Sequence, residues 1–383
     1  MLAPRIALDA RTVLGRKTGD RTYTLNLLRG LARVPSQYHF DVLLDAPDTD
    51  NIIAGATQNS PRFQTHILSA RNSRTWSLLA MPRWAWQHKP ALVHVHYLAP
   101  GALPCPFVTT IHDVVWRALP KTFPVKDRMI MNAAMPLTAK LARRILTVSQ
   151  ASRAEIARRL RVAPDKISVT PNAVPREFFA PVEPAQIENL RRKYELGDAP
   201  YVLSVGVLQP RKNLARLMRA FSTLQHTDPD LPHQLVVTGK PGWGAELETP
   251  PGVRFTGYVP DAELPALYAG AEVFAYPSLY EGFGLPVIEA MAAGAPVLTS
   301  NRSSLPEVAG DAAVKVDPYE VNSIRDGLRL MLRDADLCDE LRQRGKTWAA
   351  RFTVENQARA TLAAYELALS RDKWQGTGNK GGK

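Results

Sequence analysis

The segment from Tyr276 to Pro296 restricts the possible folds of this chain more than any other stretch. Its sequence is Y-P-S-L-Y-E-G-F-G-L-P-V-I-E-A-M-A-A-G-A-P, and the short apolar run 271–275 before it predicts a buried strand. A glycine loop follows at 281–284. A helix can begin at Pro286, whose missing N–H is harmless in the first turn, and end near Gly294. Such a strand–loop–helix unit directs backbone N–H groups and the positive end of a helix dipole toward an anion.

Two glutamates flank this predicted anion site. Glu281 lies on the loop, and Glu289 lies eight residues later on the predicted helix. Because carboxylates repel phosphate, these side chains are better suited to accept hydrogen bonds from hydroxyl groups. The pattern therefore favours a ligand with phosphates in the middle and hydroxyls at both ends, which is the shape of a nucleotide sugar.

The full pattern from Glu281 to Val297, E-G-F-G-L-P-V-I-E-A-M-A-A-G-A-P-V, resembles the signature of the retaining glycosyltransferases of family 4, the group 1 glycosyltransferases. This resemblance implies the GT-B architecture, in which two Rossmann-like α/β domains face a cleft and a C-terminal helix crosses back to the first domain. It implies an enzyme, a hexosyltransferase that uses a nucleotide-sugar donor. The bland alternative is an ordinary α/β turn with surface glutamates, for which the glycines alone would suffice.

The resemblance also implies roles for individual residues. Glu281 corresponds to the glutamate under the sugar ring, and Glu289 to the one on the ribose hydroxyls. The polar loop from Arg11 to Thr22 departs from the family pattern at Asp20-Arg21, where a small or apolar pair is typical. The other donor-binding residues that the resemblance implies are Gly19, Gly206, Gly239, Lys240, Tyr258, Val259, Gly282, Phe283, Gly284 and Leu285.

Two consecutive cations follow the strand that ends near Gly206. Arg211 offers a planar fork and Lys212 a point charge, the two usual ways to hold phosphate oxygens. Cations at a helix start are otherwise mildly unfavourable, which argues against a purely structural role. The resemblance implies that both bind the donor diphosphate and stabilise its charge as it leaves, so that the diphosphate itself can accept the acceptor's proton.

Three histidines follow or lie in the strands of the first half. His112, directly before Asp113, follows the predicted strand 108–111 and resembles a family histidine that contacts the transferred sugar or the acceptor; its alternative is a neutral core histidine. His94 and His96 alternate in one strand and so share a face, which favours a structural role.

The sequence predicts no metal and no cofactor. Asp48-Thr49-Asp50 matches the D-x-D pattern with which other glycosyltransferases hold a divalent ion, but it lies in a polar loop and is interpreted as a turn. The two cysteines, Cys105 and Cys338, are far apart and indicate neither a disulfide framework nor a metal site. They favour a reducing, cytoplasmic compartment.

Strand-like and helical segments alternate in two series, which predicts two parallel sheets with helices on both faces. The chain has 383 residues, 45% of them hydrophobic, enough for two cores. No apolar run reaches the ~18 residues of a membrane span. The expected divisions are an acceptor-binding domain at 1–180, a linker at 181–200, a donor-binding domain at 201–352, a helix that packs back on the first domain at 353–371, and a disordered tail at 372–383.

The excess positive charge is confined to the first half. Residues 1–190 hold 25 Lys and Arg against 13 Asp and Glu, whereas residues 191–383 hold 23 of each. The segment Arg74–Lys89 mixes tryptophans with basic residues, which suits a peripheral contact with an anionic membrane at its inner face. The alternative is an ordinary helix that packs its tryptophans on the sheet. Nucleic-acid binding is disfavoured because the basic residues form no known module.

Several functions remain open on the residues alone. The resemblance is strongest to bacterial polysaccharide mannosyltransferases, so the first expectation is mannose from GDP-mannose, transferred to a glycan or a lipid-linked saccharide. UDP-glucose or a related UDP-sugar is the alternative donor. A GT-B nucleotide-sugar epimerase, a sugar phosphorylase and a non-catalytic sugar-binding protein are the alternative functions.

Overall fold

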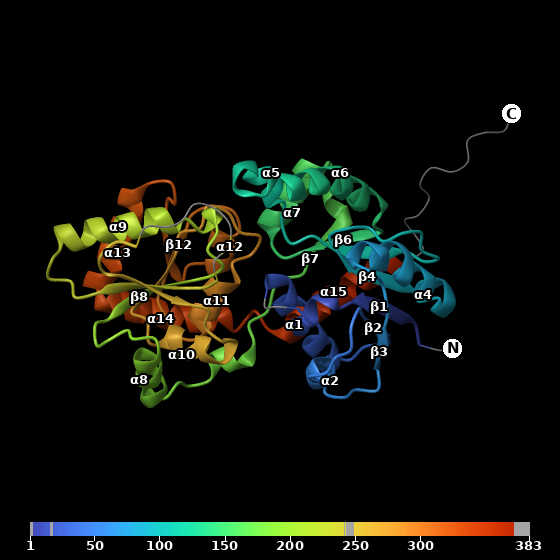
Figure 1. Ribbon diagram of the computed structural model, residues 1–383, viewed down its shortest axis with the longest axis horizontal. Coiled ribbons are helices and arrows are strands. Elements are labelled where there is room, and N and C mark those ends of the chain that lie inside the picture. Colours follow the sequence, from blue (N-terminus) through green and yellow to red (C-terminus); the bar gives the residue numbers. More distant parts are fainter. Residues whose placement is uncertain (1–2, 16–17, 241, 243–248, 371–383) are drawn as a thin grey trace.

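The computed structural model describes residues 3–15, 18–240, 242 and 249–370. These residues form two β-sheets, each covered by helices on both faces (Figure 1). All the strand pairs of the described residues are parallel. Most successive strands are joined by a helical crossover, whereas the strands at 92–96 and 107–110 are joined by a loop that contains no helix. The two parallel α/β halves that the sequence predicts are therefore confirmed.

The first sheet has seven strands. Alternate residues of β4 point to opposite faces, so Val93 and Val95 pack against one helical layer and Leu92 against the other. In spatial order the strands are β3 (Phe63–Ile67), β2 (His39–Leu44), β1 (Arg5–Asp9), β4 (Leu92–His96), β5 (Phe107–Thr110), β6 (Arg144–Thr147) and β7 (Ile167–Val169).

The second sheet has six strands. In spatial order they are β10 (Val253–Gly257), β9 (Gln234–Thr238), β8 (Tyr201–Val205), β11 (Val273–Tyr276), β12 (Val297–Ser300) and β13 (Ala313–Val316). In both sheets the strand order reverses beside the first strand, which creates a crevice at the carboxyl ends of the strands.

The helices follow the sequence signals for their ends. Ser149 caps α7, and its Oγ accepts a hydrogen bond from the Ser152 N–H at 3.0 Å. The helices of the first half are α1 (Gly19–Arg33), α2 (Ile52–Thr57), α3 (Ser73–Thr75), α4 (Met81–His88), α5 (Val115–Ala118), α6 (Val125–Leu141) and α7 (Gln150–Leu160). Those of the second half are α8 (Pro184–Lys193), α9 (Leu214–Thr227), α10 (Leu264–Ala269), α11 (Leu285–Ala292), α12 (Leu305–Ala309), α13 (Val321–Arg333) and α14 (Ala335–Ala349).

The last helix, α15 (Val354–Leu369), returns to the first sheet and packs along α1 (Figure 1). A Cβ atom on Gly30 would lie 2.0 Å from the Val354 carbonyl oxygen, so the two helices can approach this closely only with glycine there. The Tyr365 hydroxyl lies 2.7 Å from His94 Nδ1 and ties the helix to β4. The predicted C-terminal crossover is confirmed, whereas the predicted disordered tail, 372–383, lies outside the described residues.

The segment Arg74–Lys89 was expected either to contact a membrane or to form an ordinary helix packed on the sheet. Neither expectation describes its whole length. It forms α3, a π-helical stretch η2 (Trp76–Ala80) and then α4, with Pro82 in the first turn of α4. Trp76 and Trp84 are buried against the sheet, as the core alternative predicts, but Trp86 is 58% exposed. No helix among the described residues is both long and apolar enough to cross a bilayer.

Candidate active site

A cavity of about 400 Å³ lies between the carboxyl ends of the two sheets. Its walls come from loops that follow β1, β4 and β5 on one side, and β8, β9, β10 and β11 on the other. The cavity brings together every residue that the sequence singles out for donor binding or catalysis: Gly19, His112, Gly206, Arg211, Lys212, Gly239, Lys240, Tyr258, Val259, Glu281, Gly282, Phe283, Gly284, Leu285 and Glu289.

The glycine loop after β11 joins the two halves of the molecule. Gly284 precedes α11 with φ = 104°, a left-handed conformation that favours glycine. A Cβ atom on Gly282 would lie 2.8 Å from the His112 carbonyl oxygen, so the loop touches the first half at that residue. The Gly282 carbonyl accepts hydrogen bonds from the hydroxyls of Ser149 at 2.7 Å and Ser152 at 2.9 Å. The chain thereby fixes the loop from both sides of the cleft.

Glu281 forms a buried ion cluster with the two cations of the site. Its Oε2 lies 2.5 Å from Arg211 Nη1, its Oε1 lies 2.8 Å from Lys212 Nζ, and the Tyr276 hydroxyl donates to Oε1 at 3.0 Å. Burial raises the pKa of Glu281, but Arg211 and Lys212 outweigh burial and hold that pKa at about 2. Burial lowers the pKa of Lys212 to about 8, against the opposing effect of Glu281. At neutral pH the cluster therefore holds one anion and two cations.

The backbone around these cations leaves room for a polyanion. Gly206 and Gly239 have φ of 149° and 153°, and a Cβ atom on Gly239 would lie 1.8 Å from the Gly206 carbonyl oxygen. The loops after β8 and β9 can therefore approach each other this closely only because residue 239 has no side chain. With Arg211, Lys212 and the start of α11, this cradle provides the charge and N–H donors that phosphate groups require.

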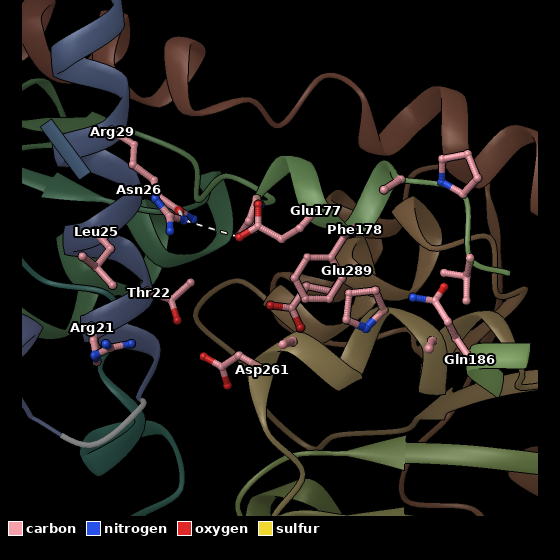
Figure 2. A pocket seen from close by; sticks show the side chains of 17 residues that line it. Arg21, Thr22, Leu25, Asn26, Arg29, Glu177, Phe178, Gln186, Asp261 and Glu289 are labelled. Atoms are coloured by element: carbon pink, nitrogen blue, oxygen red, sulfur yellow. Dashed lines mark hydrogen bonds and ion pairs between the residues drawn. The ribbon is translucent and has the colours of Figure 1, made fainter. Parts of the chain in front are cut away.

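Glu289 lies on α11, 6% exposed, and its Oε2 accepts a hydrogen bond from the Tyr268 hydroxyl at 3.2 Å. It also faces a second cavity of about 490 Å³, together with Asp261 (Figure 2). Arg29 of α1 reaches across that cavity to Glu177, with Nη1 3.7 Å from Oε1. Glu289 and Asp261 thus line both cavities, which meet at this end of the cleft.

His112 lies on the opposite wall, where sequence reasoning missed two partners. Its Nε2 is buried and lies 3.4 Å from Asp20 Oδ1, while the Tyr97 hydroxyl donates to the same carboxylate oxygen at 3.3 Å. Burial lowers the pKa of His112, so its imidazole is neutral at pH 7. Asp20 is one of the two residues that differ from the family pattern. That difference was the sequence signal that could have pointed to Asp20 as part of the site.

The remaining predicted residues lie at the mouth or away from the chemistry. Lys240 Nζ lies 4.1 Å from the centre of the Tyr258 ring at the cavity rim. His94 is buried between Tyr365 and Thr110, in keeping with a structural role. The carboxylate oxygens of Asp48 accept hydrogen bonds from the Ile52 and Ile53 N–H groups, at 2.9 and 2.7 Å, so Asp48 caps α2 within a turn. Among the described residues no three His, Cys, Asp or Glu side chains group together as metal ligands would.

Comparison with known proteins identifies the family. Residues 186–348 match the family described as glycosyl transferases group 1, and residues 18–178 match glycosyltransferase family 4. The O-antigen chain mannosyltransferase B of Escherichia coli is 39% identical over 91% of this chain and 96% of its own length. The MMP alpha-(1->4)-mannosyltransferase of Mycolicibacterium hassiacum is 34% identical over 59% of this chain and 54% of its own.

Solved structures share the fold. Sucrose-phosphate synthase from Thermosynechococcus elongatus superposes with a TM-score of 0.71 at 20% identity, over 95% of this chain and 98% of that one. Anabaena HepE in complex with UDP and glucose gives 0.72 at 16% identity, over 95% and 99%. At these identities the likeness concerns the fold alone. The sequence relationship and the fold agree, and the chain belongs to the family 4, or group 1, glycosyltransferases with the GT-B fold.

Proposed function

We propose that this protein is a retaining, metal-independent mannosyltransferase that uses GDP-mannose and extends a glycan or a lipid-linked saccharide. The observation that carries the proposal is the buried cluster of Glu281, Arg211 and Lys212 on the floor of the cleft. The name of the 39% identical relative, an O-antigen chain mannosyltransferase, supports the choice of sugar and acceptor. The names of the relatives give no support to an epimerase or a phosphorylase.

In the proposed mechanism the donor diphosphate replaces Glu281 as the anion that contacts the two cations. Arg211 and Lys212 then face phosphate oxygens, and the Glu281 carboxylate turns to the hydroxyls of the sugar above it. The bond between the sugar C1 and the diphosphate oxygen breaks as the acceptor oxygen approaches from the same face. The departing diphosphate accepts the acceptor's proton, so the protein supplies position and charge rather than a strong base.

The other residues hold the two ends of the reaction. Glu289 accepts hydrogen bonds from the ribose hydroxyls, and the backbone at Tyr258 and Val259 faces the base. On the acceptor side, the neutral His112 and the Asp20 carboxylate offer complementary hydrogen-bonding groups 3.4 Å apart. A sugar hydroxyl can donate to Asp20 while its neighbour contacts His112, which would orient the attacking oxygen.

We also propose a division of labour along the chain. Residues 1–180 form the acceptor-binding domain, 181–200 the linker, 201–352 the donor-binding domain, and 353–371 the helix that returns to the first domain. A lipid-linked acceptor would bring the first domain into peripheral contact with an anionic membrane.

The test compares donors and products directly. The protein is incubated with GDP-mannose, UDP-glucose and UDP-galactose together with a mannose-terminated acceptor, and the anomeric configuration of the product is read by NMR. We expect transfer from GDP-mannose with an α-linkage and without added metal. An inverted linkage would overturn the retaining mechanism, and exclusive use of a UDP-sugar would overturn the donor.

A further inference from the structure

Helix α6 leaves a ridge of apolar side chains in solvent. Val125, Met129, Leu137 and Leu141 are each more than half exposed. They recur at intervals of four or eight residues, so they form one inclined row along a helix about 25 Å long. The inner side of α6, by contrast, packs into the core through residues such as Met135. The described residues include no element that covers the ridge.

A second exposed group lies next to this ridge. Leu78 and Leu79 of η2 and Trp86 of α4 are also more than half exposed. The loop 98–102 connects the two groups, because the Ala99 N–H donates to Thr138 Oγ1 of α6 at 2.9 Å and the Gly101 N–H donates to the Ser77 carbonyl at 3.1 Å.

The inner sides of helices α4 and α6 (Figure 1) pack on the same face of the first sheet. Phe107 of that sheet packs against the hydrophobic core under α4 and against the one under α6. We call the seven side chains together the outer face: Leu78, Leu79, Trp86, Val125, Met129, Leu137 and Leu141.

Basic side chains predominate around the outer face, where Asp127 is the one acidic residue of α6. Arg83, Lys89, Lys126 and Lys140 are exposed, and within the described part of the chain none of the four takes part in an ion pair. The sequence contains no Asp or Glu from residue 51 to 112. Some exposed arginines of the second half, such as Arg333 and Arg344, instead pair with carboxylates. Unpaired cations beside an apolar ridge are complementary to a surface with anionic headgroups over an apolar interior.

We propose that the outer face docks on an anionic phospholipid surface, an inference that rests on the proposed lipid-linked acceptor. The apolar row would lie at the boundary between headgroups and acyl chains, with the cations among the phosphates. The position of the cleft supports this orientation. Tyr97 lines the cavity, and Leu98, the next residue, is exposed in the loop that connects the two parts of the outer face. A saccharide anchored in the same membrane would enter the cleft from this side.

Co-sedimentation with vesicles tests the docking without donor, acceptor or catalysis. The full chain is mixed with vesicles of phosphatidylcholine alone, or with phosphatidylglycerol added, at rising salt. We expect binding only with phosphatidylglycerol and a fall of at least tenfold between 50 and 500 mM salt, since surface charges are then screened. A triple variant, Arg83→Glu, Lys126→Glu and Lys140→Glu, should lose at least tenfold in binding. So should Leu79→Ser combined with Met129→Ser.

Matched controls are available in the second half of the chain and on α15. Arg192→Glu on α8 with Arg219→Glu on α9 reverses two exposed charges, and Leu330→Ser with Leu367→Ser removes two exposed leucines elsewhere. These controls should bind vesicles like the wild type. Vesicle binding retained by both outer-face variants, or equal with and without phosphatidylglycerol, would overturn the docking. Transfer to a soluble acceptor should persist in all the variants. Loss of the docking proposal would therefore leave the proposed function intact, and loss of the proposed function would leave the vesicle-binding result intact.

Discussion

Replacing Glu281 with glutamine separates the two tasks that its carboxylate performs. In the resting cluster the pKa of Glu281 is held at about 2, compared with an ordinary 4.5. That difference corresponds to about 3 kcal/mol in favour of the ionised, folded form. Because the folded-state pKa is depressed, this stability is fully present above about pH 4.5 and is lost as the pH falls toward 2. At pH 7 Glu281→Gln should therefore lower the free energy of unfolding by about 3 kcal/mol, roughly 6–12 °C in Tm.

GDP should reverse part of this loss. The substitution leaves Arg211 and Lys212 without their anion, and the diphosphate supplies a replacement. Saturating GDP should accordingly raise the Tm of the variant by more than that of the wild type. Transfer should nevertheless be abolished, because the carboxylate that we propose contacts the sugar is missing. Differential scanning fluorimetry with and without GDP, and a transfer assay, measure these effects.

A matched control is Glu355→Gln, which removes a glutamate that also lies between two arginines, Arg33 at 3.3 Å and Arg176 at 3.0 Å. That cluster is partly exposed and its three residues do not line the cavity of the cleft, so the change should cost at most about 1 kcal/mol and leave transfer intact. The reasoning is refuted if Glu281→Gln transfers within a few-fold of the wild type, or if GDP stabilises it less than the wild type.

The other predictions concern the two ends of the cleft and the metal. The pKa of Lys212 is about 8. Because we propose that its protonated form binds diphosphate, the Kd of GDP should rise by up to tenfold per pH unit above pH 8. A Kd that stays constant up to pH 9.5 would contradict this. Glu289→Ala should weaken GDP about tenfold but leave pyrophosphate binding unchanged in calorimetry. Asp20→Asn should raise the acceptor KM at least tenfold with an unchanged Kd for GDP-mannose. Transfer should survive EDTA; a loss that Mn²⁺ restores would assign a metal to Asp48 and Asp50.

Local sequence signals were sufficient for the elements that build the donor side. The glycine loop and α11 lie where 276–296 predicts them, because strand, glycine and N-terminal proline are all local preferences. The strands β3 and β13 were not predicted. Both are edge strands: three of the five residues of β3 are exposed and only one residue of β13 is buried, so neither carries the apolar run of a central parallel strand.

The pairing of Glu281 with Arg211 and Lys212 could not be predicted from spacing. Seventy residues separate Arg211 from Glu281, and only the adjacency of β8 and β11 in the sheet brings them together. The resemblance places the carboxylate on the sugar and the cations on the phosphates, which are separate contacts. The structure adds that the carboxylate and both cations contact one another directly. We propose that a diphosphate competes with the Glu281 carboxylate for Arg211 and Lys212. Displaced from the cations, Glu281 can then contact the sugar while the cations bind phosphate.

The ridge on α6 shows what a periodic pattern cannot indicate. An apolar residue at every fourth position predicts a helix with one apolar face, and such a face is normally interpreted as the one that packs on the core. In α6 the row of Val125, Met129, Leu137 and Leu141 faces solvent, while the sheet is covered by smaller contacts from Met135 and Ala139. The spacing alone therefore does not specify which face of such a helix lies inside. Lys126 and Lys140 lie beside the exposed row and not on the opposite side of the helix. This arrangement can be recognised only once the structure is known.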